Sequence, residues 1–306
     1  MTVSHHTHFP NRPSGLVRAV ATRRPVFTYC MFAVGLSVSL IAVLLVADVS
    51  VIPGKAAQLL IVPGAAVLIT VWISGRAGVR QLVAGLLHWR IGAARWLLVL
   101  LALPIITLVV AAATGTLEAA PKGWLNTLTT YLLTLVVLVI IGNLLEEMAW
   151  TGFVQARLMA RHGLLAGSLL TAVPVFLIHL PLSFETNGLY GTRWEDALLN
   201  WGLLLLALVF FRYLAGVLML ETNGSILAVG VLHASFNASG GMDVTPGGWQ
   251  YVPAIIILTL LVTAYRAWRG RPVDQPVTAL AEAAGGAPAG SAPEHAPRRT
   301  IYSSLG

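Results

Sequence analysis

The sequence predicts an all-α membrane protein, a polytopic transmembrane helical bundle of about eight spans. Hydrophobic residues make up 57% of the 306 residues and charged residues only 10%, whereas a soluble domain carries about 25% charged residues. The mean hydropathy is +0.80. Apolar runs near the roughly 20 residues that a helix needs to cross a bilayer recur along the chain. Lipid is therefore the main solvent of this protein.

The predicted spans follow one another within a single transmembrane domain, residues 26–269. They are the apolar runs 26–46, 59–73, 96–114, 131–154, 164–182, 197–220, 226–238 and 252–268. The first run is too long for a typical signal-peptide core and lacks a convincing cleavage site, so we expect it to be retained. The second and seventh runs are short. The seventh also carries polar side chains, which indicates a helix that faces protein rather than lipid.

The two ends of the chain are predicted to be tails. Residues 1–25 are polar and basic, and their small histidine cluster of His5, His6 and His8 is interpreted as part of a disordered tail rather than as a metal site. Residues 270–306 are rich in Ala, Pro and Gly, which favours disorder. Cys30 is the single cysteine, so neither an intramolecular disulfide nor a cysteine metal cluster can form.

The net charge of +7 would suggest a nucleic-acid partner in a soluble protein. Here it follows from the loops, because basic residues accumulate on the cytoplasmic side of membrane proteins. With the N-terminus inside, every Lys and Arg falls in a cytoplasmic segment except Lys55, Lys122 and Arg193 in outer loops and Arg212 within a span. We therefore predict an integral protein of a prokaryotic plasma membrane, with both termini cytoplasmic, the lipid bilayer as a partner and no nucleic-acid partner.

Polar side chains inside the apolar runs are the candidates for function. Glu146 and Glu147 lie side by side in the run 131–154. An ionised carboxylate in hydrocarbon is costly, so an intramembrane acid is a functional-site hypothesis by default. His179 and Arg212 lie within two further spans, and His233 and Asn237 share a helix face in a third because they are four residues apart.

These residues have the chemistry of water activation. A rise of about 1.5 Å per residue places Glu146, His179 and His233 at similar depths in the bundle. A carboxylate, two imidazoles and the Asn237 amide supply a general base, a second proton carrier and an oxyanion donor. One intramembrane histidine by itself is more often a packing or hydrogen-bonding residue, so the hypothesis depends on the residues occurring together.

Three segments resemble the motifs of a known family. The segment Glu146-Glu147-Met148-Ala149-Trp150-Thr151-Gly152 resembles the first motif of the CAAX-protease and bacteriocin-processing family, which includes the type II CAAX prenyl endopeptidases. The segment that ends at His179 is similar to the second motif, and His233-Ala234-Ser235-Phe236-Asn237 is similar to the third. The resemblance covers residues 131–240, the protease-like core.

The resemblance implies an intramembrane glutamic endopeptidase with no cofactor. Glu146 would activate water with assistance from His179, while His233 and Asn237 would stabilise the oxyanion and Glu147 would orient the site. A zinc site of the His-Glu-x-x-His type is not expected, because that pattern is absent from the sequence. The implied substrate is a peptide or membrane protein at or near the membrane, and prenylated peptides are one such class.

Two departures from the family pattern matter. Thr151 stands where the first motif has an arginine, one helical turn after Glu147, and Val175 stands where the second motif often has phenylalanine. We predict that Glu147 is either neutral or paired with a substitute cation, for which Arg212 is the best candidate. In the alternative, Arg212 extends its charged end to the membrane interface.

Two other classes of function remain open. A catalytically impaired relative would bind or scaffold a partner, using the inherited site as a binding cavity. A proton-coupled transporter would use Glu and His as a relay, and an internal inverted repeat or broken helices would favour it. The sequence shows no such repeat.

Overall fold

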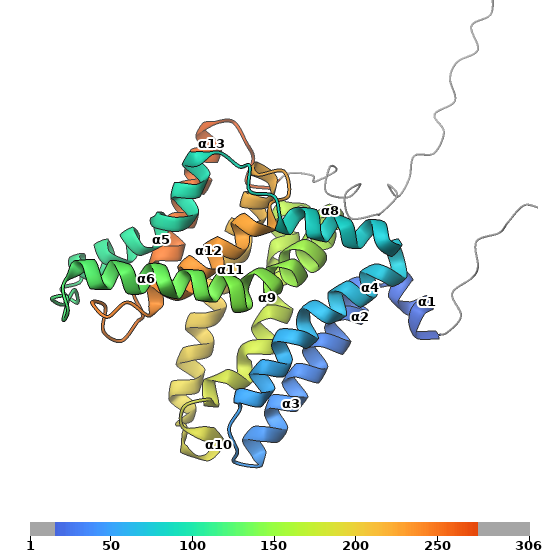
Figure 1. Ribbon diagram of the computed structural model, residues 1–306, viewed down its shortest axis with the longest axis horizontal. Helices are drawn as coiled ribbons and strands as arrows, with labels where there is room; N and C mark the ends of the chain where they lie inside the picture. Colours follow the sequence, from blue (N-terminus) through green and yellow to red (C-terminus); the bar gives the residue numbers. More distant parts are fainter. Residues whose placement is uncertain (1–15, 275–306) are drawn as a thin grey trace, which may run out of the picture.

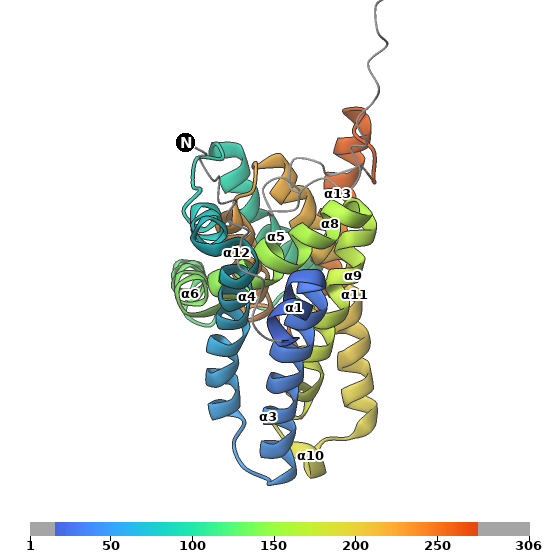
Figure 2. The same cartoon turned by 90° about the vertical axis from the view of Figure 1, so that its right-hand side faces the viewer.

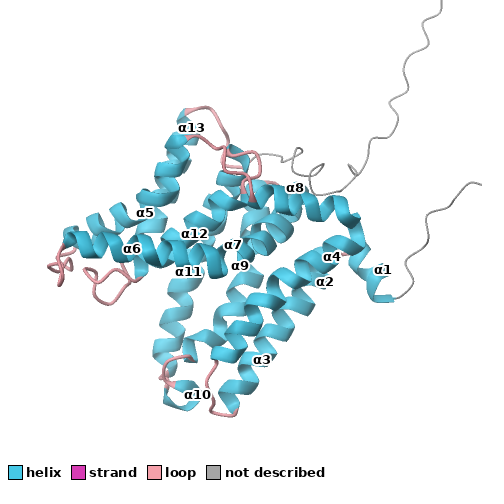
Figure 3. Ribbon diagram, in the orientation of Figure 1, coloured by secondary structure: helices cyan, strands magenta, loops and turns pink. Residues whose placement is uncertain are grey.

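The computed structural model describes the backbone of residues 16–274 and the side chains of residues 19–139 and 142–274. All regular structure in this part of the chain is helical (Figure 3). The elements before the central segment are α1 (Leu16–Arg23), α2 (Pro25–Tyr29), η1 (Cys30–Val34), α3 (Gly35–Val46), α4 (Ile52–Leu86) and α5 (Ala93–Ala113). The central segment comprises α6 (Trp124–Leu138), η2 (Val139–Asn143), α7 (Leu144–Glu147), η3 (Met148–Gln155) and α8 (Ala156–His162). The remaining elements are α9 (Leu164–His179), η4 (Leu180–Phe184), α10 (Gly188–Gly191), α11 (Trp194–Glu221), α12 (Ile226–Gly240) and α13 (Tyr251–Trp268).

The helices confirm the predicted polytopic bundle. Six helical stretches in the described part are long and apolar enough to cross a membrane: Pro25–Val46, Ile52–Leu86, Ala93–Ala113, Leu164–Phe184, Trp194–Glu221 and Tyr251–Trp268. Two shorter apolar helices, Trp124–Leu138 and Ile226–Gly240, supplement them. Each of the eight predicted apolar runs therefore lies in or overlaps a helix.

Two predicted spans are longer in the structure than the apolar runs indicate. The run 59–73 belongs to α4, which starts at Ile52 with a proline in its first turn and kinks at Gly75, where φ is 59°. Only glycine adopts that backbone region without strain. The run 131–154 lies within one continuous helical path from Trp124 to His162 that includes the π-helical segments η2 and η3. Polar and charged residues end an apolar run without ending a helix. The sequence therefore underestimates the length of both helical segments.

The tails are described only in part. Helix α1 lies in the segment that the sequence assigns to a disordered tail, so that prediction is wrong for residues 16–23. At the other end the backbone carbonyl of Val273 accepts a hydrogen bond from the Tyr213 hydroxyl (3.0 Å), and Asp274 Oδ1 accepts one from the Leu165 N–H (3.0 Å) at the start of α9. The histidine cluster and residues 275–306 lie outside the described residues.

The helices form two groups that meet at α11 and α12. Helices α3 and α4 lie side by side, and α9 packs against α11 (Figures 1 and 2). Helix α6 runs across the bundle at a large angle to α3 (Figures 1 and 2). Helix α12 packs against α5, α6 and α11. The central segment that carries the two glutamates contacts both groups, since α7 packs against α4 and α12.

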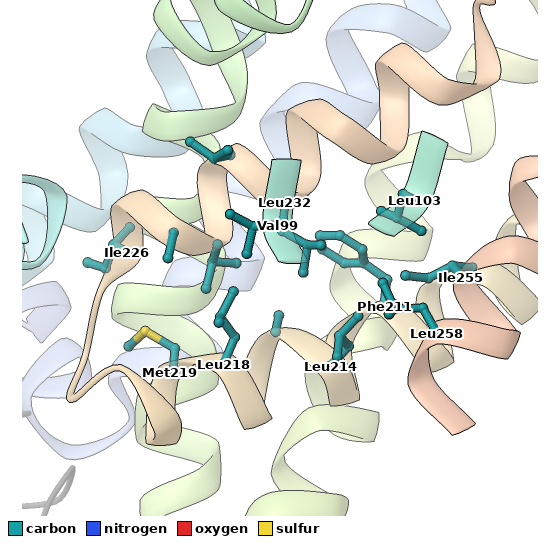
Figure 4. Packing of buried hydrophobic residues seen from close by; sticks show 14 of the residues in the cluster. Val99, Leu103, Phe211, Leu214, Leu218, Met219, Ile226, Leu232, Ile255 and Leu258 are labelled. Carbon is teal, nitrogen blue, oxygen red and sulfur yellow. The ribbon is translucent and has the colours of Figure 1, made fainter. Parts of the chain in front are cut away.

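The largest apolar cluster surrounds α12. Leu232 of α12 is fully buried with Val99 and Leu103 of α5, and Phe211 of α11 and Ile255 of α13 complete this part of the cluster (Figure 4). This packing fits the expectation that the polar-containing seventh run faces protein. It also gives His233, which follows Leu232, a rigid support.

The loops separate into two ends in agreement with their charge. At one end the Ser225 hydroxyl donates to the backbone carbonyl of His88 (2.6 Å), and Arg266 and Arg271 both bind Glu221. At the other end Lys55 pairs with Glu185 (2.7 Å). Loops predicted to be cytoplasmic thus contact one another, as do loops predicted to be outside.

The tight turn between α8 and α9 allows a stability prediction. A Cβ added at Gly167 would lie 2.4 Å from the backbone nitrogen of Met159, which cannot move without distorting α8. We expect Gly167→Ala to destabilise the protein by about 1–3 kcal/mol or more through overpacking, measured as thermal unfolding in detergent. The matched control is Gly202→Ala in α11, where a Cβ meets nothing within 4 Å. That variant should be neutral or more stable because alanine favours helix. Equal effects of the two substitutions would contradict the packing described here.

Candidate active site

The two adjacent glutamates occupy different environments. They end the four-residue helix α7, which lies between the π-helical segments η2 and η3, and such segments are frequent at functional sites. Consecutive helical residues point about 100° apart. The Glu147 side chain is accordingly fully buried, whereas Glu146 is half-buried and lines a cavity.

Glu147 is held by a buried arginine. Arg212 of α11 donates from Nη1 to Glu147 Oε2 (2.8 Å) and from Nη2 to Glu147 Oε1 (2.6 Å). Such two-point pairing of guanidinium and carboxylate is among the stronger interactions in proteins. Arg212 is fully buried. The structure therefore confirms Arg212 as the substitute partner of Glu147, and the alternative in which it reaches the membrane interface is wrong.

Thr151 takes part in the same cluster. Its hydroxyl donates to Glu147 Oε2, and Arg212 Nη1 lies 3.3 Å from its oxygen. The small threonine leaves room for a guanidinium that comes from another helix. Gln155, one turn later, donates to the backbone carbonyl of Arg212 (2.6 Å) and to the Ser168 hydroxyl (3.1 Å), which ties η3 to α11 and α9.

His233 is the third group on Glu147. Its Nδ1 lies 2.8 Å from Glu147 Oε1, and its ring packs against Phe211 with 5.1 Å between ring centroids. A carboxylate beside one ring nitrogen fixes the orientation of an imidazole and leaves the other nitrogen for chemistry. Glu147 therefore orients the His233 ring through Nδ1 and leaves Nε2 without contact to the carboxylate.

His179 has a defined proton arrangement. Its Nδ1 lies 2.7 Å from the backbone carbonyl oxygen of Val175. A carbonyl can only accept, so Nδ1 donates, and Nε2 of the neutral ring is an acceptor. Glu146 and His233 are close enough to act on His179 electrostatically. The structure thus brings the two histidines and the two glutamates into one neighbourhood.

Glu146 faces a cavity of about 320 Å³. It makes no hydrogen bond or ion pair with any side chain among residues 19–139 and 142–274, so its carboxylate is available to a ligand. Asn237 is one turn after His233 on α12 and is exposed. It is not hydrogen-bonded to any side chain that the structure describes, so it is the one predicted site residue that stands apart.

A comparison with protein families bears on this arrangement. Residues 128–239 match the family model described as type II CAAX prenyl endopeptidase, Rce1-like. These residues, called the Rce1-like domain below, thus resemble the CAAX-protease family. The match covers less than half of the chain and confirms the family indicated by the three motifs. A search of curated proteins found no match. The Rce1-like domain includes both glutamates, both histidines and Arg212.

Two residues near the site escape the sequence patterns. Tyr29 of α2 is fully buried, and its ring packs against Trp150 and Phe153 with centroid distances of 5.5 and 5.4 Å. Gln58 of α4 lines the cavity of Glu146. Both lie outside the Rce1-like domain. Tyr29 lies near the start of one apolar run, and Gln58 lies one residue before the next run. Polar residues at such positions are ordinarily found at the membrane interface, so no local signal in the sequence marks either of them as a site residue.

The donor set of the Rce1-like domain does not favour a metal ion. Within residues 16–274, no three His, Cys, Asp or Glu side chains converge as metal ligands. The guanidinium of Arg212 already occupies both Glu147 oxygens. A second cation there would face like-charge repulsion. The expectation of metal-independent chemistry stays a prediction.

Proposed function

We propose that this protein is an intramembrane glutamic endopeptidase in which Glu146 activates the attacking water. The different environments of the two glutamates are the observation that supports this function. Glu147 is fully buried and compensated by Arg212, so it cannot take part in proton exchange with a substrate. Glu146 lines a cavity and is uncommitted. A free carboxylate beside an oriented imidazole is the arrangement that general-base catalysis needs.

The proposed reaction uses these groups in turn. Glu146 removes a proton from water, and the water oxygen attacks the scissile carbonyl carbon while the carbonyl electron pair moves to oxygen. His233, which Glu147 orients, and the Asn237 amide stabilise this oxyanion. The oxyanion electron pair then re-forms the carbonyl as the C–N bond breaks. The departing amine receives the proton that Glu146 took from water, either directly or by way of Nε2 of His179, which accepts in the neutral ring. Glu147 and Arg212 position His233 and do not touch the substrate.

The Rce1-like domain suggests a CAAX-type peptide as substrate. The test uses purified protein in lipid nanodiscs and a fluorogenic peptide that ends in a farnesylated Cys-a-a-X sequence. We expect cleavage on the C-terminal side of the modified cysteine, and we expect it to persist after treatment with EDTA and phenanthroline. Binding of the peptide without cleavage would instead indicate a scaffold. Activity lost to chelation and restored only by zinc would contradict the glutamate mechanism.

We also infer that the basic end of the bundle faces the cytoplasm. This end carries Arg266 and Arg271, and the loops predicted to be cytoplasmic meet there. On a Cys30→Ser background, a single cysteine beside Arg90 should react with a membrane-impermeant maleimide only from the cytoplasmic side. A cysteine beside Lys122 should react only from outside. The reverse labelling pattern would overturn the orientation.

A further inference from the structure

The cavity of Glu146 extends along one face of α4. Its wall consists of Ile52, Lys55, Ala56 and Leu59 together with Gln58. The first four are spaced i, i+3, i+4 and i+7, so they form one stripe of the helix. Glu146 reaches this stripe from α7, which packs against α4. A substrate that presents its scissile bond to Glu146 therefore runs along the first two turns of α4.

Gln58 is a buried polar side chain in this wall. It is 7% exposed, and its Oε1 has no hydrogen-bond partner within the described residues. Leaving a buried polar atom unsatisfied is costly, so such atoms in native proteins need an explanation. An apolar residue of the same length would pack there without this cost. Selection for stability alone does not account for a glutamine at this position.

We propose that Gln58 is a substrate-binding residue whose carboxamide hydrogen-bonds the peptide main chain next to the scissile bond. The proposal rests on the proposed function and extends it to a residue outside the Rce1-like domain. A carboxamide offers one acceptor and two donors, and a peptide group offers the complementary N–H and C=O. Oε1 is buried and has no partner within the described residues, and rotation of the carboxamide about its last bond turns it toward the cavity, where it accepts the N–H of the substrate.

The chemistry of the wall selects a peptide amide over other ligands. An acyl or prenyl chain has no hydrogen-bonding group for Gln58. A cation would be repelled by Lys55, and an anion by Glu146, which share the cavity with Gln58. A neutral amide that both donates and accepts fits between these two charges.

Gln58 does not titrate, so its contribution is binding rather than proton transfer. Gln58→Met keeps the length of the side chain and removes its hydrogen bonds. We expect this variant to raise KM about five-fold, the value of one ordinary hydrogen bond, with kcat little changed, which is the signature of lost uniform binding. Its thermal stability should equal or exceed that of the wild type, because the unsatisfied atom is gone. The matched control, Gln81→Met, changes a glutamine of the same helix that lies in a different cavity and should leave KM unchanged.

A binding cycle separates this role from a structural one. In the inactive Glu146→Gln background, the affinity of the farnesylated Cys-a-a-X peptide is compared with two analogues. Each analogue replaces one amide N–H beside the scissile bond with an ester oxygen. We expect one replacement to weaken binding about five-fold when Gln58 is present and to have no effect in Gln58→Met. If Gln58→Met fails to fold, Gln58→Ala is used in the same cycle.

The outcomes decide both proposals separately. Equal losses with and without Gln58, or no binding of the peptide at all, would overturn the role of Gln58. If the cycle shows coupling but the wild-type protein does not cleave the peptide, the role of Gln58 stands and the protease function fails.

Discussion

Glu146→Gln is expected to lower the turnover of the CAAX-type peptide by about 10²–10⁴-fold, the usual contribution of a general base. The substitution preserves shape and removes the only group at the cavity that can accept a proton from water while carrying a negative charge. Because Glu146 makes no ion pair in the described part of the chain, the thermal stability should be unchanged. The measurement is kcat in the nanodisc assay together with the unfolding temperature.

Two comparisons sharpen this expectation. Glu195→Gln, a substitution of an exposed acid paired only with Arg193, should leave both turnover and stability at the wild-type level. Glu147→Gln should lower both, because it leaves Arg212 buried without its counter-charge. Substitutions of His179 and His233 should cause losses that do not add to that of Glu146→Gln, since groups that act as one unit are non-additive. Wild-type turnover in Glu146→Gln would refute the mechanism.

Arg212→Ala is expected to destabilise the protein by about 3–5 kcal/mol, the cost of breaking a buried ion pair from one side. The loss leaves the Glu147 carboxylate in an apolar environment with only the Thr151 hydroxyl and His233 as partners. Turnover should fall as well, because Glu147 would no longer hold His233 in one orientation. Unfolding in a denaturant series, in detergent, measures the first effect. Unchanged stability and activity would show that the pair has no role.

A charge swap tests the geometry of the pair. Thr151→Arg in the wild type places a second guanidinium beside Arg212 and should be destabilising through like-charge repulsion and overpacking. In the Arg212→Ala background the same substitution restores a cation one turn from Glu147 and has the vacated volume to fill. We therefore expect partial rescue of stability. Thr151→Val, which removes only the hydroxyl, should have a smaller effect than Arg212→Ala. Failure of rescue together with a harmless Thr151→Arg would contradict the arrangement.

The buried cluster supplies a cation to Glu147 in the absence of the motif arginine. The positive charge that the motif would supply from residue 151 comes from residue 212, on a helix that packs against α9 and η3. The carboxylate of Glu147, its cation and the imidazole of His233 lie together in this cluster. At Thr151 the positive charge is therefore supplied by another helix.

The sequence by itself determines the solvent, the helical class and the candidate residues for chemistry. Apolar runs and their charged boundaries are local properties, so they identify helices such as α5 and α9 without reference to packing. The motif residues Glu146, His179 and His233 are recognisable because they interrupt those runs with costly polar groups. Their resemblance to one family follows from three short patterns in order.

Only the tertiary structure decides which partner each of these groups has. Arg212 is 65 residues from Glu147, and no periodicity relates two helices that are so far apart in the chain. The contrast between buried Glu147 and accessible Glu146 depends on how α7 is rotated against α4 and α12, which packing sets. Gln58 is also identified by packing alone. In the sequence it is a glutamine beside an apolar run, and it becomes a candidate substrate ligand because α7 brings the free carboxylate of Glu146 into the cavity that Gln58 lines.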